Sequence, residues 1–161
     1  MGSNRRHGEH GRPRGVVLAA MEELSALGTV DARSPVIASA PIGAARRIFA
    51  NAVAQLETDL APPALLRELK RFERDFGRRP GKTWGDRVLD LDIVLWSGGR
   101  WHSRSLHIPH RGLAARSFVL GPATAIAPGW RDPDSGLTLR QLQARLTRPQ
   151  ALPRDRTRSD P

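Results

Sequence analysis

Two aspartates separated by one residue are the strongest candidates for chemistry in this sequence. Asp90 and Asp92 lie in the run from Val88 to Trp96, which is rich in Leu, Ile and Val and predicts a β-strand. Since successive strand side chains point to opposite faces, the two carboxylates share one face and lie about 7 Å apart. Two like charges this close are costly unless a cation neutralises them, and carboxylate oxygens suit Mg²⁺ that is held jointly by substrate phosphates. A solvated strand face is the competing interpretation of this pair taken alone.

Cationic side chains flank this run on both sides. Four precede it within ten residues, namely Arg78, Arg79, Lys82 and Arg87. His110 and Arg116 follow it, and Phe118 comes two residues after Arg116. Guanidinium, ammonium and imidazole groups around paired carboxylates suit phosphoryl transfer, in which positioning and charge neutralisation supply most of the catalysis.

The composition favours one small basic domain. The chain has 161 residues and a formal charge of +10, and 39% of its residues are hydrophobic, which is enough for a single core. It has no cysteine, so disulfide frameworks, thiolate metal sites and cysteine nucleophiles are excluded. Its apolar runs are much shorter than the roughly 20 residues that span a bilayer, and we expect a cytoplasmic protein.

The positive charge also suits a small nucleic-acid-binding module, which is the main alternative from another functional class. Half of the charge lies at the ends, because residues 1–16 contribute +3 and residues 148–161 contribute +2. The four tryptophans show no repeated basic and aromatic pattern. We therefore expect a monomer that acts on small-molecule substrates, with no nucleic-acid or membrane partner.

The elements that must position these residues follow from the spacing of apolar side chains and from Pro and Gly breaks. In chain order they are a helix at 16–27, strands at 29–40 and 49–58, a helix at 62–76, a loop at 77–87, a strand at 88–96 and a helix at 137–146. The first five helices and strands match the end of a split-βαβ unit, a ferredoxin-like α+β sandwich in which helices cover an antiparallel sheet. We expect this domain over residues 1–147 and a disordered Arg- and Pro-rich tail over 148–161.

Several short motifs share the spacing of one known family. In the segment from Trp84 to Val94, an arginine precedes two aspartates by three and five residues. The pattern continues in Ile108–His110 and Arg116–Leu120, and it reaches back through Phe49–Val53 to Gly2–Asn4. With these motifs the chain resembles the 6-hydroxymethyl-7,8-dihydropterin pyrophosphokinase family of folate biosynthesis, over roughly residues 2–146.

This resemblance implies transfer of a pyrophosphoryl group from MgATP to the pterin hydroxymethyl oxygen, with release of AMP. Asp90 and Asp92 would hold two Mg²⁺ ions, and Arg78 and Arg87 would act beside them on the phosphates. The other nucleotide-binding positions that it implies are Glu73, Arg79, Lys82, His110 and Arg116. Lys70 falls at the same nucleotide site and departs from the family pattern.

For the pterin, the resemblance implies a ring held between Phe49 and Phe118, with Asn51 at its polar edge. The main-chain groups that it implies are those of Ser39, Ala40 and Ile42. A flat heteroaromatic ring does favour aromatic faces combined with a few fixed donors and acceptors. Without the motifs, both phenylalanines would be interpreted as core residues, whereas Asn51 needs hydrogen-bond partners in either case.

The start of the chain departs from the family pattern. In the family an apolar strand precedes Gly-Ser-Asn, and here Met1 stands where that strand should end. Without this strand, the sheet would expose two neighbouring strand edges. We expect the native start to lie upstream; the alternatives are a sheet closed in another way, an expression remnant, and an inactive truncated member of the family.

Overall fold

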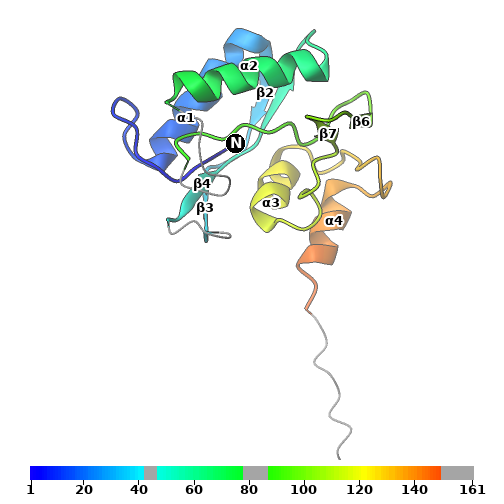
Figure 1. The fold of residues 1–161 in the computed structure, drawn as a ribbon. Helices are drawn as coiled ribbons and strands as arrows, with labels where there is room; N and C mark the ends of the chain where they lie inside the picture. The colour runs from blue at the N-terminus through cyan, green and yellow to red at the C-terminus, as the bar shows by residue number, and fades with distance from the viewer. Residues whose placement is uncertain (42–46, 78–86, 150–161) are drawn as a thin grey trace, which may run out of the picture.

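Short antiparallel strands and four α-helices build the part of the chain that the structure describes (Figure 1). This computed structural model describes residues 1–41, 47–77 and 87–149. The helices are α1 (Pro13–Glu23), which continues into the 3₁₀ turn η1 (Leu24–Leu27), α2 (Pro62–Asp75), α3 (Ser117–Ile126) and α4 (Leu139–Leu146). The strands are β1 (Gly2–Ser3), β2 (Thr29–Arg33), β3 (Ile37–Ser39), β4 (Phe49–Asn51), β5 (Ala54–Glu57), β6 (Trp101–His102) and β7 (His107–Ile108).

The predicted strands at 29–40 and 49–58 form one long antiparallel hairpin that is split in the middle. β2 pairs with β5, and β3 pairs with β4, which also pairs with β1. Between the two halves, the Ser34 hydroxyl accepts a hydrogen bond from the Val53 main-chain N–H at 2.9 Å. Pro35 has no N–H to donate, so the ladder is interrupted there. The expected α+β class and the antiparallel pairing are confirmed.

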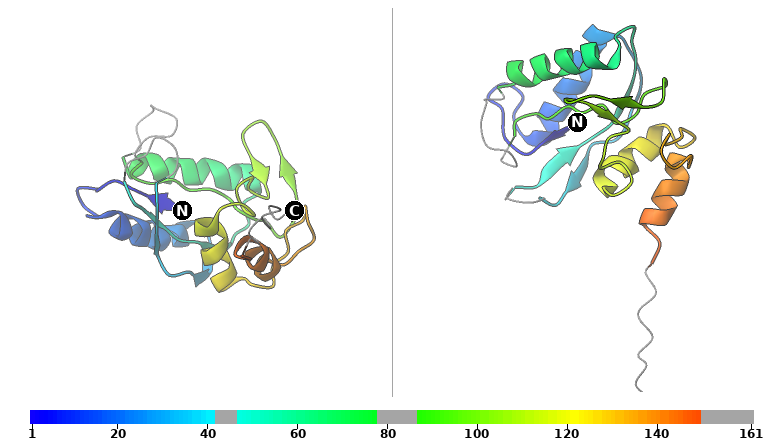
Figure 2. Two further views of the ribbon diagram at one scale, coloured as in Figure 1. Left: turned by 90° about the horizontal axis from the view of Figure 1, so that it is seen from below. Right: turned by 45° about the vertical axis from the view of Figure 1, so that its right-hand side comes forward.

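The predicted helices at 16–27 and 62–76 are confirmed, and their apolar stripes meet in the main core. Val16, Ala20 and Leu24 pack in one buried cluster with Leu69 and Phe76, and Leu89 and Leu91 complete it. Both views of Figure 2 show α3 and α4 packed together, and the right-hand view shows them apart from α2. These two helices enclose a second core, and α4 confirms the last predicted helix.

Leu120 lies at the centre of the second core, and we expect its truncation to destabilise the fold. The side chain is 0% exposed and packs with Leu139 and Leu142 across the α3–α4 contact. Leu120→Ala leaves a cavity there and should lower the free energy of unfolding by about 2–5 kcal/mol. Leu18→Ala is the matched control, because Leu18 is 40% exposed on α1. Urea unfolding followed by tryptophan fluorescence measures both variants, and equal losses in the two would contradict this packing.

The prediction of a strand from Val88 to Trp96 is wrong. The expected alternation of side chains is present, since Leu89 and Leu91 are buried in the core and the two aspartates lie on the other face. A strand also needs a hydrogen-bonded neighbour along its length. The two-residue β1 supplies only one bridge, between Gly2 and Asp90, so the segment is extended chain and not a strand.

The C-terminal half contains two elements that the sequence pattern did not predict. β6 and β7 form a small antiparallel hairpin, and the segment around Phe118 is the helix α3. The expected tail lies outside the described residues beyond position 149, and so does most of the expected loop at 77–87. Over the described ranges, no helix has both the length and the apolar character needed to cross a membrane.

Candidate active site

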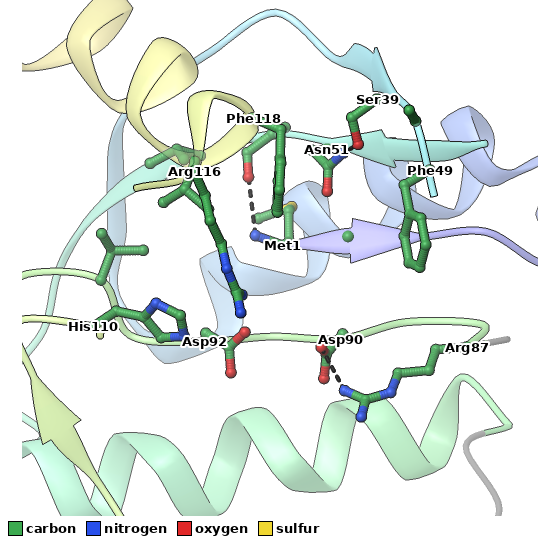
Figure 3. A pocket seen from close by; sticks show the side chains of 16 residues that line it. Met1, Ser39, Phe49, Asn51, Arg87, Asp90, Asp92, His110, Arg116 and Phe118 are labelled. Atoms are coloured by element: carbon green, nitrogen blue, oxygen red, sulfur yellow. Dashed lines mark hydrogen bonds and ion pairs between the residues drawn. The ribbon is translucent and has the colours of Figure 1, made fainter. Parts of the chain in front are cut away.

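A cavity of about 360 Å³ lies between β1, β3, β4, the extended segment 87–94 and the start of α3 (Figure 3). Ten residues predicted from the sequence line it: Ser39, Ala40, Phe49, Asn51, Arg87, Asp90, Asp92, His110, Arg116 and Phe118. The remaining lining residues are Met1, Gly2, Ala52, Val53, Val94 and Val119. Sequence reasoning missed these six as site residues because small or apolar side chains carry no chemical signal of their own. Their only signal is position in the chain: Ala52 and Val119 directly follow predicted site residues, and Gly2, Val53 and Val94 lie within the motif segments.

The two aspartates form the acidic end of the cavity. Their carboxylates project from the same side of the extended segment (Figure 3). The side chain of Asp90 is 24% exposed and that of Asp92 is 47% exposed. Arg87 Nη1 lies 2.6 Å from Asp90 Oδ2, which is a charge-assisted hydrogen bond. Two accessible carboxylates on one side of the chain form a hard-oxygen donor set that fits Mg²⁺.

Asn4 fixes the main chain from which Arg87 extends. Its side-chain Oδ1 accepts a hydrogen bond from the Arg87 N–H at 2.6 Å, and its own N–H donates to the Arg87 carbonyl oxygen at 3.1 Å. The Asn4 side chain is buried. Asn4 is therefore a positioning residue that the sequence motif contained but whose role the motif did not indicate.

Met1 lies beside the acidic end, and its amino group donates to the Ala52 carbonyl oxygen at 2.9 Å. Burial lowers the pKa of the Met1 amino group, and the negative charges of Asp92 and Asp90 act in the opposite direction.

His110 has a ring orientation that suits a hydrogen-bond donor facing the cavity. Its Nδ1 accepts a hydrogen bond from the Gly112 main-chain N–H at 3.0 Å. In the neutral ring the proton is then on Nε2. The His110 main chain is itself held, because its N–H donates to the Val94 carbonyl oxygen at 2.9 Å. The ring can therefore donate one hydrogen bond to an anionic ligand.

Arg116 extends from the start of α3 into the cavity, toward the side where Asp92 lies (Figure 3). Gly112 makes room for it, because a Cβ at that position would lie 2.6 Å from Arg116 Cδ. The guanidinium carbon also lies 6.0 Å from the centre of the Phe118 ring, within the range of a cation–π contact. The side chain thus joins the charged and aromatic parts of the cavity.

The aromatic end of the cavity is built around Asn51. Phe49 and Phe118 stand on either side of it in Figure 3. As the sequence required, the buried Asn51 amide has a partner: its Nδ2 donates to the Ser39 hydroxyl at 2.7 Å. Its carbonyl oxygen points toward the cavity, next to Gly2. Two ring faces and one fixed amide suit a flat, polar-edged ligand.

Five predicted positions are not in the cavity lining. Ile42, Arg78, Arg79 and Lys82 lie outside the described residues. Glu73 lies on α2, where its side chain is 1% exposed and contacts the segment that carries the two aspartates. Its carboxylate accepts hydrogen bonds from Lys70 Nζ and from the Leu91 main-chain N–H.

A second group of possible metal ligands, His7, Glu9 and His10, lies in the loop before α1. The two imidazole rings stack 4.7 Å apart with planes inclined by 16°, so their in-plane nitrogen lone pairs do not converge on one point. His7 Nδ1 also accepts hydrogen bonds from two main-chain N–H groups, each at 3.2 Å. We assign no metal to this group.

Acidic, cationic and aromatic groups thus surround a single cavity in an α+β domain. This arrangement is typical of a phosphoryl-transfer enzyme whose acceptor is a flat ring, because it places anion-binding groups next to stacking faces.

Comparison with known proteins agrees with that class. The chain belongs to the 7,8-dihydro-6-hydroxymethylpterin-pyrophosphokinase (HPPK) family, whose sequence profile matches residues 1–128. A 2-amino-4-hydroxy-6-hydroxymethyldihydropteridine pyrophosphokinase of Pseudomonas aeruginosa is 40% identical over 125 residues, which are 76% of this chain and 77% of that protein. The enzyme of the same name from Synechocystis is 42% identical over 94 residues, or 58% of this chain and 48% of the relative. The enzyme from Haemophilus influenzae is 44% identical over 79 residues, or 49% of this chain and 49% of the relative. The chain therefore spans about half the length of these last two relatives.

Proposed function

We propose that this chain transfers the pyrophosphoryl group of ATP to 6-hydroxymethyl-7,8-dihydropterin, with release of AMP. The single observation that carries the proposal is that one cavity of about 360 Å³ joins the aromatic end around Asn51 to the acidic and cationic end around Asp92. The printed names of the relatives, which are pyrophosphokinases of a hydroxymethyldihydropteridine, support the same reaction.

The aromatic end would orient the pterin. Phe49 and Phe118 offer ring faces, and the Asn51 carbonyl oxygen accepts a hydrogen bond from the polar edge of the ring. Main-chain groups of Ser39 and Ala40 border the same region. A ring held in this way directs its hydroxymethyl group toward the acidic end, where the phosphates lie.

In the proposed reaction, the hydroxymethyl oxygen attacks the β-phosphorus of ATP. A bond forms between that oxygen and the phosphorus, the bond to the oxygen shared with the α-phosphate breaks, and the hydroxyl proton is released. Arg87, His110 and Arg116 would bind phosphate oxygens of ATP and hold its triphosphate group in line for attack. Arg78, Arg79 and Lys82 are proposed as further phosphate contacts on the strength of the sequence motif alone.

Asp90 and Asp92 would hold Mg²⁺ together with the phosphates, and we propose two ions. When bound, Mg²⁺ neutralises charge on the phosphate oxygens and aligns them. The protein's own contribution is to present both carboxylates from one side of the chain, with Arg87 against Asp90.

The direct test is an assay for AMP with ATP, Mg²⁺ and the hydroxymethyl pterin. We expect AMP to form only when all three are present, together with one equivalent of pterin diphosphate. Reactions that lack the pterin are the control for simple ATP hydrolysis. A folded chain that releases no AMP in the complete mixture would refute the proposal.

The ring of Phe118 provides a test of the pterin end. Phe118→Leu keeps an apolar side chain but removes the stacking face, and stacking of a base on an aromatic ring contributes about 1–3 kcal/mol. We expect the KM for the pterin to rise by about fivefold to 150-fold, while the KM for ATP changes little. Phe118→Tyr is the matched control, since it retains the ring. A Phe118→Leu enzyme with an unchanged pterin KM would show that the ring does not hold the substrate.

A further inference from the structure

The main chain between the two aspartates is held by side chains of a helix. The Leu91 N–H donates to Glu73 Oε1 at 2.7 Å, and the Leu91 carbonyl oxygen accepts from Lys70 Nζ at 2.8 Å. Lys70 Nζ also donates to Glu73 Oε1 at 2.6 Å, so the two side chains form one unit on α2. In Figure 3 the segment that carries the aspartates runs between β1 and this helix.

These side chains take the place of a neighbouring strand. In extended chain, the N–H and C=O of successive residues point to opposite edges. Those of Asp90 pair with Gly2 of β1, at 2.8 and 2.9 Å. The N–H and C=O groups of Leu91 point to the other edge of the segment, where the neighbouring element is α2. Because buried peptide groups need hydrogen-bond partners, α2 must supply an acceptor and a donor there. Glu73 supplies the acceptor and Lys70 the donor.

The two hydrogen bonds fix the peptide units on either side of Leu91. The Leu91 N–H belongs to the peptide that follows Asp90, and the Leu91 carbonyl belongs to the peptide that precedes Asp92. Holding both planes sets the direction in which each aspartate leaves the main chain. Lys70 Nζ also lies 3.9 Å from Asp92 Oδ1, so the same ammonium group adjoins a carboxylate of the site.

The burial of Glu73 agrees with a positioning role. The Glu73 side chain is 1% exposed, whereas that of Lys70 is 33% exposed, and burying a carboxylate costs desolvation energy that a well-packed apolar side chain would avoid. Apolar side chains, however, cannot hydrogen-bond to the Leu91 peptide groups. The pair therefore provides directional bonds at the one residue that separates the proposed metal ligands.

We infer that Lys70 and Glu73 are positioning residues that hold Asp90 and Asp92 in the geometry that binds a divalent cation. This inference rests on the proposed function for the identity of the site. It also assigns a role to Lys70, the position that departs from the family pattern.

The test compares variants of the pair with a control on the same helix. Glu73→Leu and Lys70→Met each remove one hydrogen bond to Leu91. Glu73→Gln is the conservative variant, because its Oε1 still accepts from both Leu91 and Lys70. Arg71→Met is the matched control, since Arg71 is exposed on α2.

The readout is Mn²⁺ affinity in the presence of α,β-methylene-ATP, from the electron paramagnetic resonance signal of free Mn²⁺. Loss of a group that orients metal ligands typically costs about 10–100-fold in metal affinity. We expect a loss of this size in Glu73→Leu and Lys70→Met, and affinities close to wild type in Glu73→Gln and Arg71→Met. Urea unfolding of each variant identifies conditions in which all are folded.

Wild-type Mn²⁺ affinity in folded Glu73→Leu and Lys70→Met would show that the pair is only structural and overturn the inference. If Glu73→Leu does not fold, the comparison of Lys70→Met with Arg71→Met decides in the same way. No Mn²⁺ binding by the wild-type chain would also overturn it. The measurement involves no transfer, so it decides this inference even if the wild-type chain releases no AMP and the proposed function fails.

Discussion

Asp92→Asn is expected to slow AMP formation by about 10³-fold, because it removes a negative charge from the proposed metal site while keeping the shape of the side chain. Asp92 is the more accessible of the two carboxylates, and it faces His110 and Arg116 across the cavity (Figure 3). The carboxylate is not buried in the core, so we expect the free energy of unfolding to change by no more than about 0.5 kcal/mol.

The measurement is the rate of AMP release at saturating ATP and pterin, with Asp59→Asn as the control for loss of an exposed carboxylate. A partial recovery at high Mg²⁺ concentration would agree with weakened cation binding. A rate for Asp92→Asn equal to that of Asp59→Asn would exclude Asp92 from the metal site.

Much of the fold is encoded in local patterns and could be predicted. The apolar stripe from Val16 to Leu24 and the one from Leu69 to Phe76 each define a helix face, and these faces meet in one core. The alternation around Asp90 correctly placed Leu89 and Leu91 on the face opposite the aspartates, and that face is buried. Side-chain periodicity depends only on the local chain, so it is visible in the sequence.

Hydrogen-bond partners are not local, and here sequence reasoning was wrong or incomplete. The same alternation predicted a strand at 88–96, but a strand also requires a neighbour, and Gly2 is the one residue of β1 that forms a bridge with this segment. The partners of Leu91 are instead the side chains of Lys70 and Glu73. No pattern along the chain indicates that a helix side chain will bond to a peptide group 18 residues away.

The lining of the cavity was better predicted than the residues that support it, for the same reason. Motif spacing identified the charged and aromatic residues that line the cavity, such as Asp92, Arg116 and Phe118. It did not show that Asn4 holds the main chain of Arg87 across 83 residues of sequence. Residues that touch a ligand are recognised by their chemistry, whereas residues that position them are recognised only from the folded chain.

Arg116→Gln is expected to lower kcat by about 10²–10³-fold, which is the second large effect that the structure predicts. The guanidinium reaches into the cavity over the Phe118 ring. A fixed cation there can stabilise the charge that is redistributed over the phosphate oxygens in the transition state. Glutamine has a similar length and can donate a hydrogen bond, but it carries no positive charge. Arg116→Lys should lose less, because it keeps the charge and loses only the planar fork of donors.

Arg100→Gln separates this effect from a general loss of positive charge. Arg100 is exposed and pairs with Asp134 at 2.7 Å on the surface, so its loss should leave kcat unchanged and stability almost unaffected. In Arg116→Gln, a raised KM for ATP with an unchanged kcat would mean that Arg116 binds the nucleotide equally in the ground and transition states. That result would mean that Arg116 contacts a part of ATP that does not react. The transferring pyrophosphoryl group would then have to lie nearer Arg87 and His110.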